Sequence, residues 1–283
     1  MSQVYIYEPN QRLKEGFFRS WKVMFSNLFR YRELILQLFI KDFFGGLRKS
    51  LAGYLWLFVS PILSIIPFIY LNYNGLLSPG DVGVPYPIYA ALSALVYSLF
   101  VGFYEAASRT IQTGADLLTN VNYPHEVLLL KQTIDYLAGF TISFIINLLL
   151  GFLFGVRFHW SLLFFPLLVI PLFLLGAALG LLVSVASVVS NDAQRVVTVF
   201  LMVLQAITPL YYTADAIQSP TLRLVMLWNP LTYLVGGVRD MIFYGGMDAP
   251  GTFFLCAGLS LLVFLFCWRL FYISEQHVIE KML

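Results

Sequence analysis

The side chains that could catalyse a reaction or bind a metal are few and scattered in this sequence. His125, His159 and His277 lie far apart, without the spacing that metal ligands require. The sequence contains no G-x-x-x-x-G-K-[ST] nucleotide-binding loop, no G-x-S-x-G motif and no H-E-x-x-H motif. We therefore expect no catalytic residue and no metal site on this chain.

Carboxylates inside a membrane could instead drive ion-coupled transport. Carriers of that kind place ionisable residues or broken helices near the middle of the bilayer. Here Glu105 and Asp135 lie close to the ends of long apolar runs. We expect no buried charge network and find no obvious inverted repeat. Energy for transport would then come from another protein, or the chain would be passive.

The amino-acid composition indicates whether the chain folds in water or in a membrane. Of 283 residues, 59% are hydrophobic and 11% are charged, whereas soluble domains have about 45–50% and about 25%. Mean hydropathy is +0.80. These values indicate a membrane protein and exclude a disordered chain, a coiled coil and an ordinary cytosolic enzyme. The net charge of +2 is too small to indicate a nucleic-acid binder.

Six apolar runs are long enough to cross a bilayer, which takes about 20 residues of helix. We predict an all-α membrane protein that forms a single domain over residues 1–283. Its parts are an amphipathic cytoplasmic region at 1–52, a six-helix core at 53–273 and a cytoplasmic tail at 274–283. The predicted spans are residues 53–71, 87–104, 133–156, 162–189, 196–212 and 253–273.

The distribution of Lys and Arg predicts the orientation. Nine of these residues precede the first span, and no signal peptide is evident there. With the N-terminus inside, fourteen of the 17 Lys and Arg residues are cytoplasmic. Both termini are then cytoplasmic, as six spans require.

Residues 11–30 have the pattern of a basic amphipathic helix at the membrane interface. Arg19 and Lys22 belong to its charged face, and Trp21 and Phe25 belong to its apolar stripe. Such a helix could only anchor the first span, or it could also dock a cytoplasmic partner.

The loop between spans two and three, residues 105–132, is the longest predicted cytoplasmic connection. Gly114 begins a short segment that could form about two helical turns. A break in the helical pattern follows this segment and extends to Pro124. Glu126 then opens the next helix, where a carboxylate suits the N-terminus. The loop could be a lever arm on the cytoplasmic side or a plain linker.

The segment between spans five and six contains two apolar pieces, 222–228 and 232–243, on either side of Asn229-Pro230. Each piece is too short to span. We predict a re-entrant helical hairpin that dips into the outer leaflet, with Arg239 and Asp240 near the external surface or facing a cavity. The alternative is an interfacial cap that only packs. Small residues four positions apart, Gly151 and Gly155 in span three and Gly176 and Gly180 in span four, predict close helix packing within the subunit, with dimerisation as the alternative.

Four stretches in order resemble the membrane subunit of ABC-2 type exporters, in particular the permeases for O-antigen, teichoic acid or capsular polysaccharide. The first, residues 39–63, has a basic stretch that runs into Gly53-Tyr54-Leu55-Trp56 and Pro61. The others are NYPHEVLLLKQ at 122–132, TPLYY at 208–212 and WNPLTYLVGGVRDMIFYG at 228–245. The resemblance covers nearly the whole chain, but the first ten residues have no role in it.

The resemblance implies a homodimer in the bacterial inner membrane that exports lipid-linked polysaccharide. Two separate nucleotide-binding subunits would carry ATP and Mg, so this chain needs no cofactor. The segments implied to couple to the ATPase contain Arg19, Lys22, Gly114, Asp116, Asn120, Tyr123, Pro124 and Glu126. The implied external gate contains Trp228, Asn229, Pro230, Arg239 and Asp240. Spans one and five would line the path with Tyr54, Trp56, Phe58, Phe68, Tyr70, Tyr73, Phe200, Tyr211 and Tyr212.

Aromatic faces would let sugar rings slide along the path, although the same residues could be interface belts or ordinary packing. Two other functions remain open from the sequence. The chain could be an ABC-2 permease for small lipids or drugs, or a membrane scaffold or enzyme of envelope glycan assembly.

Overall fold

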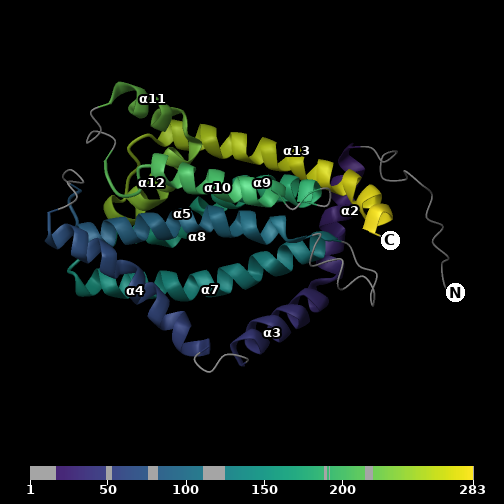
Figure 1. The fold of residues 1–283 in the computed structure, drawn as a ribbon, viewed down its shortest axis with the longest axis horizontal. Helices are drawn as coiled ribbons and strands as arrows, with labels where there is room; N and C mark the ends of the chain where they lie inside the picture. Colours follow the sequence, from purple (N-terminus) through teal and green to yellow (C-terminus); the bar gives the residue numbers. More distant parts are fainter. Residues whose placement is uncertain are drawn as a thin grey trace.

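The computed structural model describes residues 17–48, 53–75, 82–110, 125–187, 190, 192–213 and 219–282, and all regular structure within them is helical (Figure 1). The prediction of an all-α protein is confirmed for this part of the chain. The elements are α2 (Phe17–Arg30), α3 (Arg32–Arg48), α4 (Gly53–Tyr73), α5 (Tyr86–Ser108), α7 (His125–Leu153), η1 (Trp160–Phe164), α8 (Phe165–Leu168), α9 (Ile170–Ser187), α10 (Asp192–Ile207), α11 (Pro220–Trp228), α12 (Pro230–Tyr244) and α13 (Pro250–Met282).

Helix α5 is the centre of the bundle and contacts α4, α7, α9 and α12. Its closest neighbour is α9, because two glycines of α9 lie against the α5 backbone. A Cβ atom at Gly176 would lie 2.5 Å from the carbonyl oxygen of Phe100, and one at Gly180 would lie 2.4 Å from that of Tyr104. Only glycine fits at these distances, so the small-residue motif serves packing within the subunit, as predicted.

Five helical segments of the described residues are long and apolar enough to cross a membrane: 55–73, 86–108, 127–153, 160–187 and 250–274. The chain is thus a multi-pass membrane protein. The predicted fifth span differs, because α10 has 16 residues and ends at Ile207. At 1.5 Å per residue it is about 24 Å long, shorter than the hydrocarbon core of about 30 Å. Pro209 lies two residues beyond Ile207 and disfavours a helical conformation at Thr208, the residue before it. The sixth crossing stays a prediction.

The two ends of the bundle are built differently (Figure 1). Helices α2 and α3 pack against the first part of α7 at one end. There Trp21 of α2 meets Trp268 of α13 edge to face, with 5.2 Å between ring centroids. Helices α11 and α12 lie at the opposite end. The buried ion pair of Arg239 and Asp240 lies on α12, and the ion pairs of Lys131 join α7 to α3, so each end is a candidate for a site.

Candidate functional site

The turn between α11 and α12 lies at Asn229, where the sequence predicts a break. The Asn229 side chain accepts a hydrogen bond from the Leu231 N–H at 3.0 Å and so caps α12. Its amide donates to the hydroxyl of Thr208 at 2.9 Å. Pro230 occupies the first position of α12, where its missing N–H costs no bond. One buried side chain therefore caps a helix and ties it to the segment after α10.

Two further hydrogen bonds hold α11 against α12. The Thr232 hydroxyl donates to the Met226 carbonyl at 2.8 Å, and the Tyr233 hydroxyl donates to the Leu227 carbonyl at 3.0 Å. Trp228, the last residue of α11, is 82% exposed. The hairpin is therefore internally fixed and presents an indole on its outside.

Arg239 and Asp240 form a buried ion pair near the end of α12. The Nε and Nη2 atoms of Arg239 each lie 3.0 Å from Asp240 Oδ1. Nη1 donates to the Pro209 carbonyl at 3.2 Å. The guanidinium also lies over the Tyr89 ring of α5, 4.5 Å from the centroid, in cation–π geometry. The pair thus connects α12 to α5 and to the residues after α10.

Burial also shifts ionisation at this end. It raises the pKa of the Asp240 carboxyl, and the positive charge of Arg239 partly offsets that effect. It raises the pKa of the Tyr244 hydroxyl to about 12. Asp240 therefore depends on Arg239 for its ionised state, and Tyr244 is a neutral donor at physiological pH.

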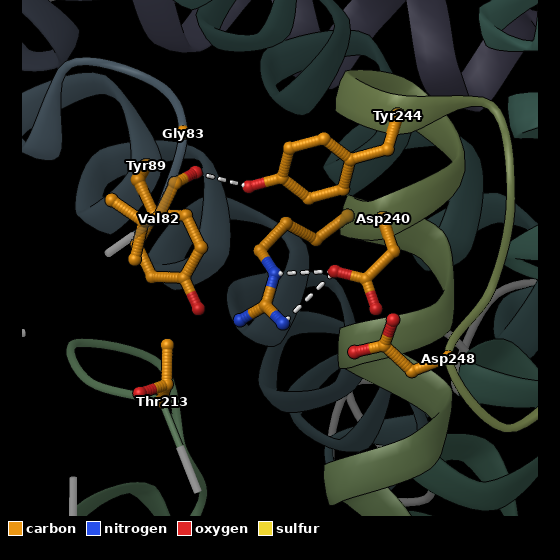
Figure 2. Close-up of a pocket in the computed structure, with 8 residues that line it drawn as sticks. Val82, Gly83, Tyr89, Thr213, Asp240, Tyr244 and Asp248 are labelled. Atoms are coloured by element: carbon orange, nitrogen blue, oxygen red, sulfur yellow. Dashed lines mark hydrogen bonds and ion pairs between the residues drawn. The ribbon is translucent and has the colours of Figure 1, made fainter. Parts of the chain in front are cut away.

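A pocket of about 350 Å³ opens beside the ion pair (Figure 2). The Tyr244 hydroxyl spans one side of it by donating to the Val82 carbonyl. Sequence reasoning singled out Arg239 and Asp240, and the prediction that they face a cavity agrees with this pocket. The sequence analysis did not identify the other lining residues, which come from three separate segments of the chain. They are Val82, Gly83, Tyr89, Thr213, Tyr244 and Asp248.

The opposite end contains an ion-pair network around one buried lysine near the start of α7, which the sequence analysis did not predict. The Lys131 side chain of α7 is 7% exposed and contacts Asp42 of α3 as well as Asp135, the latter at 2.7 Å. Lys131 and Asp135 are one helical turn apart, a spacing that the sequence shows. Asp42 lies 89 residues away, so only the fold reveals its part. A second pocket of about 410 Å³ adjoins this network.

The residues implied to couple to an ATPase are only partly described. Arg19 and Lys22 are exposed on α2. Glu126 belongs to the first turn of α7, and its side chain is outside the described part. Gly114, Asp116, Asn120, Tyr123 and Pro124 lie outside the described residues.

The aromatic residues implied to line a path lie mostly on the surface of α4 and α10. The structure brings Phe68 and Tyr211 together as stacked rings 5.3 Å apart. The Tyr212 hydroxyl donates to the Ala206 carbonyl at 2.9 Å. Tyr54 belongs to α4, and its side chain is outside the described part. The others are exposed: Trp56, Phe58, Tyr70, Tyr73 and Phe200.

Comparisons with known proteins agree on one family. Residues 33–243 match the sequence model of the ABC-2 type transporter family. The chain is also 27% identical over 219 residues to a Myxococcus xanthus protein described as the O-antigen export system permease protein RfbA. That similarity covers 77% of this chain and 82% of the relative.

Proposed function

The chain belongs to the ABC-2 type transporter family, whose members are membrane transport subunits, and we propose that it is the permease of an ATP-driven exporter of lipid-linked surface polysaccharide, O-antigen above all. The similarity to the O-antigen export permease over 77% of the chain carries this proposal. The sequence has no P-loop, which supports ATP hydrolysis on two separate nucleotide-binding subunits.

Two copies of the chain form the path, with α4 and α10 facing it. The exposure of α4 supports this arrangement: 11% of its most apolar window is buried, the lowest share among the five candidate spans. The exposed face carries Trp56, Tyr70 and Tyr73. Aromatic rings offer apolar area with a polar edge, over which the rings of a long polar chain could slide without a strong trap.

The α11–α12 hairpin re-enters the outer leaflet and gates the path, and α10 with residues 208–213 makes the sixth crossing. Irregular backbone at membrane depth must be buried in protein. Thr208 and Leu210 meet that requirement, with 1% and 0% exposure. The hydrogen bonds from Asn229 to the Thr208 hydroxyl and from Arg239 to the Pro209 carbonyl make the gate follow any movement of α10.

The α2 and α3 end faces the cytoplasm of a bacterium, and the ATPase subunits dock there. Arg19 and Lys22 are exposed on α2, and most Lys and Arg residues of the chain belong to this side. Movement of the ATPase reaches the core through α2, α3 and the loop before α7. Both chain termini lie on this side, in the inner membrane topology that six spans produce.

Co-purification and transport test this function. The chain is expressed with the nucleotide-binding subunits of the source organism and purified. We expect a complex that moves lipid-linked polysaccharide into inverted membrane vesicles only when ATP is present. A partner whose P-loop lysine is replaced is the matched control and should bind without transport. Uphill transport without nucleotide, or ATPase stimulation by drug-like amphiphiles and not by lipid-linked glycan, would contradict the proposal.

A further inference from the structure

The pocket beside Arg239 and Asp240 adjoins the proposed gate and has the features of a ligand site. Its volume of about 350 Å³ falls within the range of about 300–1,000 Å³ that small-molecule sites occupy. We propose that it binds a sugar residue of the exported glycan on the outer side of the membrane. This inference rests on the proposed function and names a substrate contact for it.

An accessible aromatic ring forms one side of the pocket. Tyr244 is 48% exposed, and its hydroxyl is held by the Val82 carbonyl (Figure 2). This bond fixes the ring in orientation while about half of the residue stays exposed. A fixed, half-exposed ring suits the apolar C–H face of a sugar, because aromatic side chains supply large contact area at little entropic cost.

Hydrogen-bonding groups surround that ring. Both contacts from Arg239 go to Oδ1 of Asp240, and the second carboxylate oxygen lies on the side of Asp248 (Figure 2). Asp248 is exposed, and no hydrogen bond or ion pair within the described residues uses its carboxylate. Acceptors and a guanidinium donor therefore lie within one small pocket.

This combination selects a neutral, hydroxyl-rich ligand. An anion would meet two carboxylates, Asp240 and Asp248. Arg239 already offsets the charge of Asp240, so a cation would find only the single unpaired carboxylate of Asp248. Hydroxyl groups donate to carboxylates and accept from guanidinium N–H groups. A sugar ring stacked on Tyr244 satisfies both kinds of partner at once.

The pocket also lies where an emerging chain would pass. It is formed by residues before α5, residue 213 after α10, and the end of α12. In the proposed topology these segments meet on the outer side, next to the α10 path. A sugar held there would keep the polymer from slipping back between strokes.

A site-specific labelling experiment tests this inference. The Val82→Cys variant, whose main-chain carbonyl can still accept from Tyr244, is expressed in the full transporter, where the native Cys256 and Cys267 are buried. A membrane-impermeant maleimide is added to cells that export the glycan or that lack its synthesis. We expect labelling about tenfold slower during export, the change for a pocket filled about nine-tenths of the time. The matched control is Trp160→Cys, an exposed position (66%) in η1 next to α12.

The Tyr244 ring supplies a second test in the Val82→Cys background. Tyr244→Ala should abolish protection, whereas Tyr244→Phe should keep it, although both lose the bond to Val82. Equal protection in Tyr244→Ala, or equal protection at the Trp160→Cys control, overturns the sugar site. Export without any protection overturns the site alone. A transporter that exports no glycan overturns the proposed function and the site with it.

Discussion

Arg239 at the α12 end and Lys131 at the α3 end are 9% and 6% exposed, but their partners differ. Arg239 pairs with its neighbour on the same helix, and that Asp240 side chain is 6% exposed. Lys131 pairs with Asp135 of its own helix and with Asp42 of α3, whose side chains are 27% and 50% exposed. The ion pair at the α12 end is thus buried except where it lines the pocket, whereas the carboxylates at the α3 end are partly open to water.

We infer from this difference that the contact of Arg239 with Asp240 is rigid, whereas Asp42 can exchange its contact with Lys131 for water. Loss of either partner at the buried pair leaves a buried charge without its counter-charge, which is strongly unfavourable. At the open network, α3 can move away while Lys131 keeps Asp135 and Asp42 gains water. We therefore expect the α12 end to move as one piece, and the α3 end to be where helices shift against each other.

The largest effect should follow Arg239→Met, which leaves Asp240 buried without its counter-charge. We expect a loss of about 3–5 kcal/mol in the free energy of unfolding, the cost of breaking a buried ion pair. The measurement is denaturant unfolding of the purified protein in detergent. Arg239→Lys keeps the positive charge but lacks the planar guanidinium. Its free energy of unfolding should therefore lie between those of the wild type and Arg239→Met. If Arg239→Met loses no more free energy of unfolding than Arg239→Lys, Asp240 does not depend on a buried counter-charge, and the proposed difference between the two ends is wrong.

Lys131→Met should cost less, roughly 1–3 kcal/mol, because both carboxylates left behind reach solvent. The same unfolding measurement applies. The matched control is Arg109→Met, which breaks an exposed pair with Glu105 at 3.4 Å and should change stability by about 0–1 kcal/mol. If Lys131→Met loses as much free energy of unfolding as Arg239→Met, the two ends do not differ in how strongly burial penalises an unpaired charge.

Asn229→Ala removes the cap of α12 and the bond to Thr208. We expect a loss of about 0.5–2 kcal/mol, the range for an N-cap residue. Asn229→Asp keeps a capping oxygen and should recover much of the loss. Trypsin cleavage in the α11–α12 region, followed over time, would show whether the hairpin has loosened. Unchanged cleavage in Asn229→Ala would show that the hairpin is held without its cap.

Asp42→Asn should have the smallest effect, about 0–1 kcal/mol, because the residue is half exposed and Lys131 keeps Asp135. The informative quantity is the ratio of transport to ATP hydrolysis in the complex. If the α3 contact serves coupling, this ratio falls while stability hardly changes. A stability loss as large as that of Lys131→Met would make Asp42 a structural partner instead.

Local features of the chain were predicted well because they depend on near neighbours. The break at Asn229-Pro230 follows from residue types at adjacent positions, and Gly176 and Gly180 mark a close helix contact by their spacing alone. The end of α10 was predicted too late. Hydropathy counts the apolar residues up to Tyr212, but Pro209 and the buried contacts of Thr208 end the helix at Ile207.

The sequence by itself determined that the chain is helical and crosses a membrane several times, since both are properties of composition and short-range pattern. Only the tertiary structure decided which charges meet. Asp42 joins Lys131 across 89 residues, and Tyr89 reaches Arg239 from another helix. Such contacts depend on how helices pack, because packing brings together side chains whose separation along the chain carries no signal.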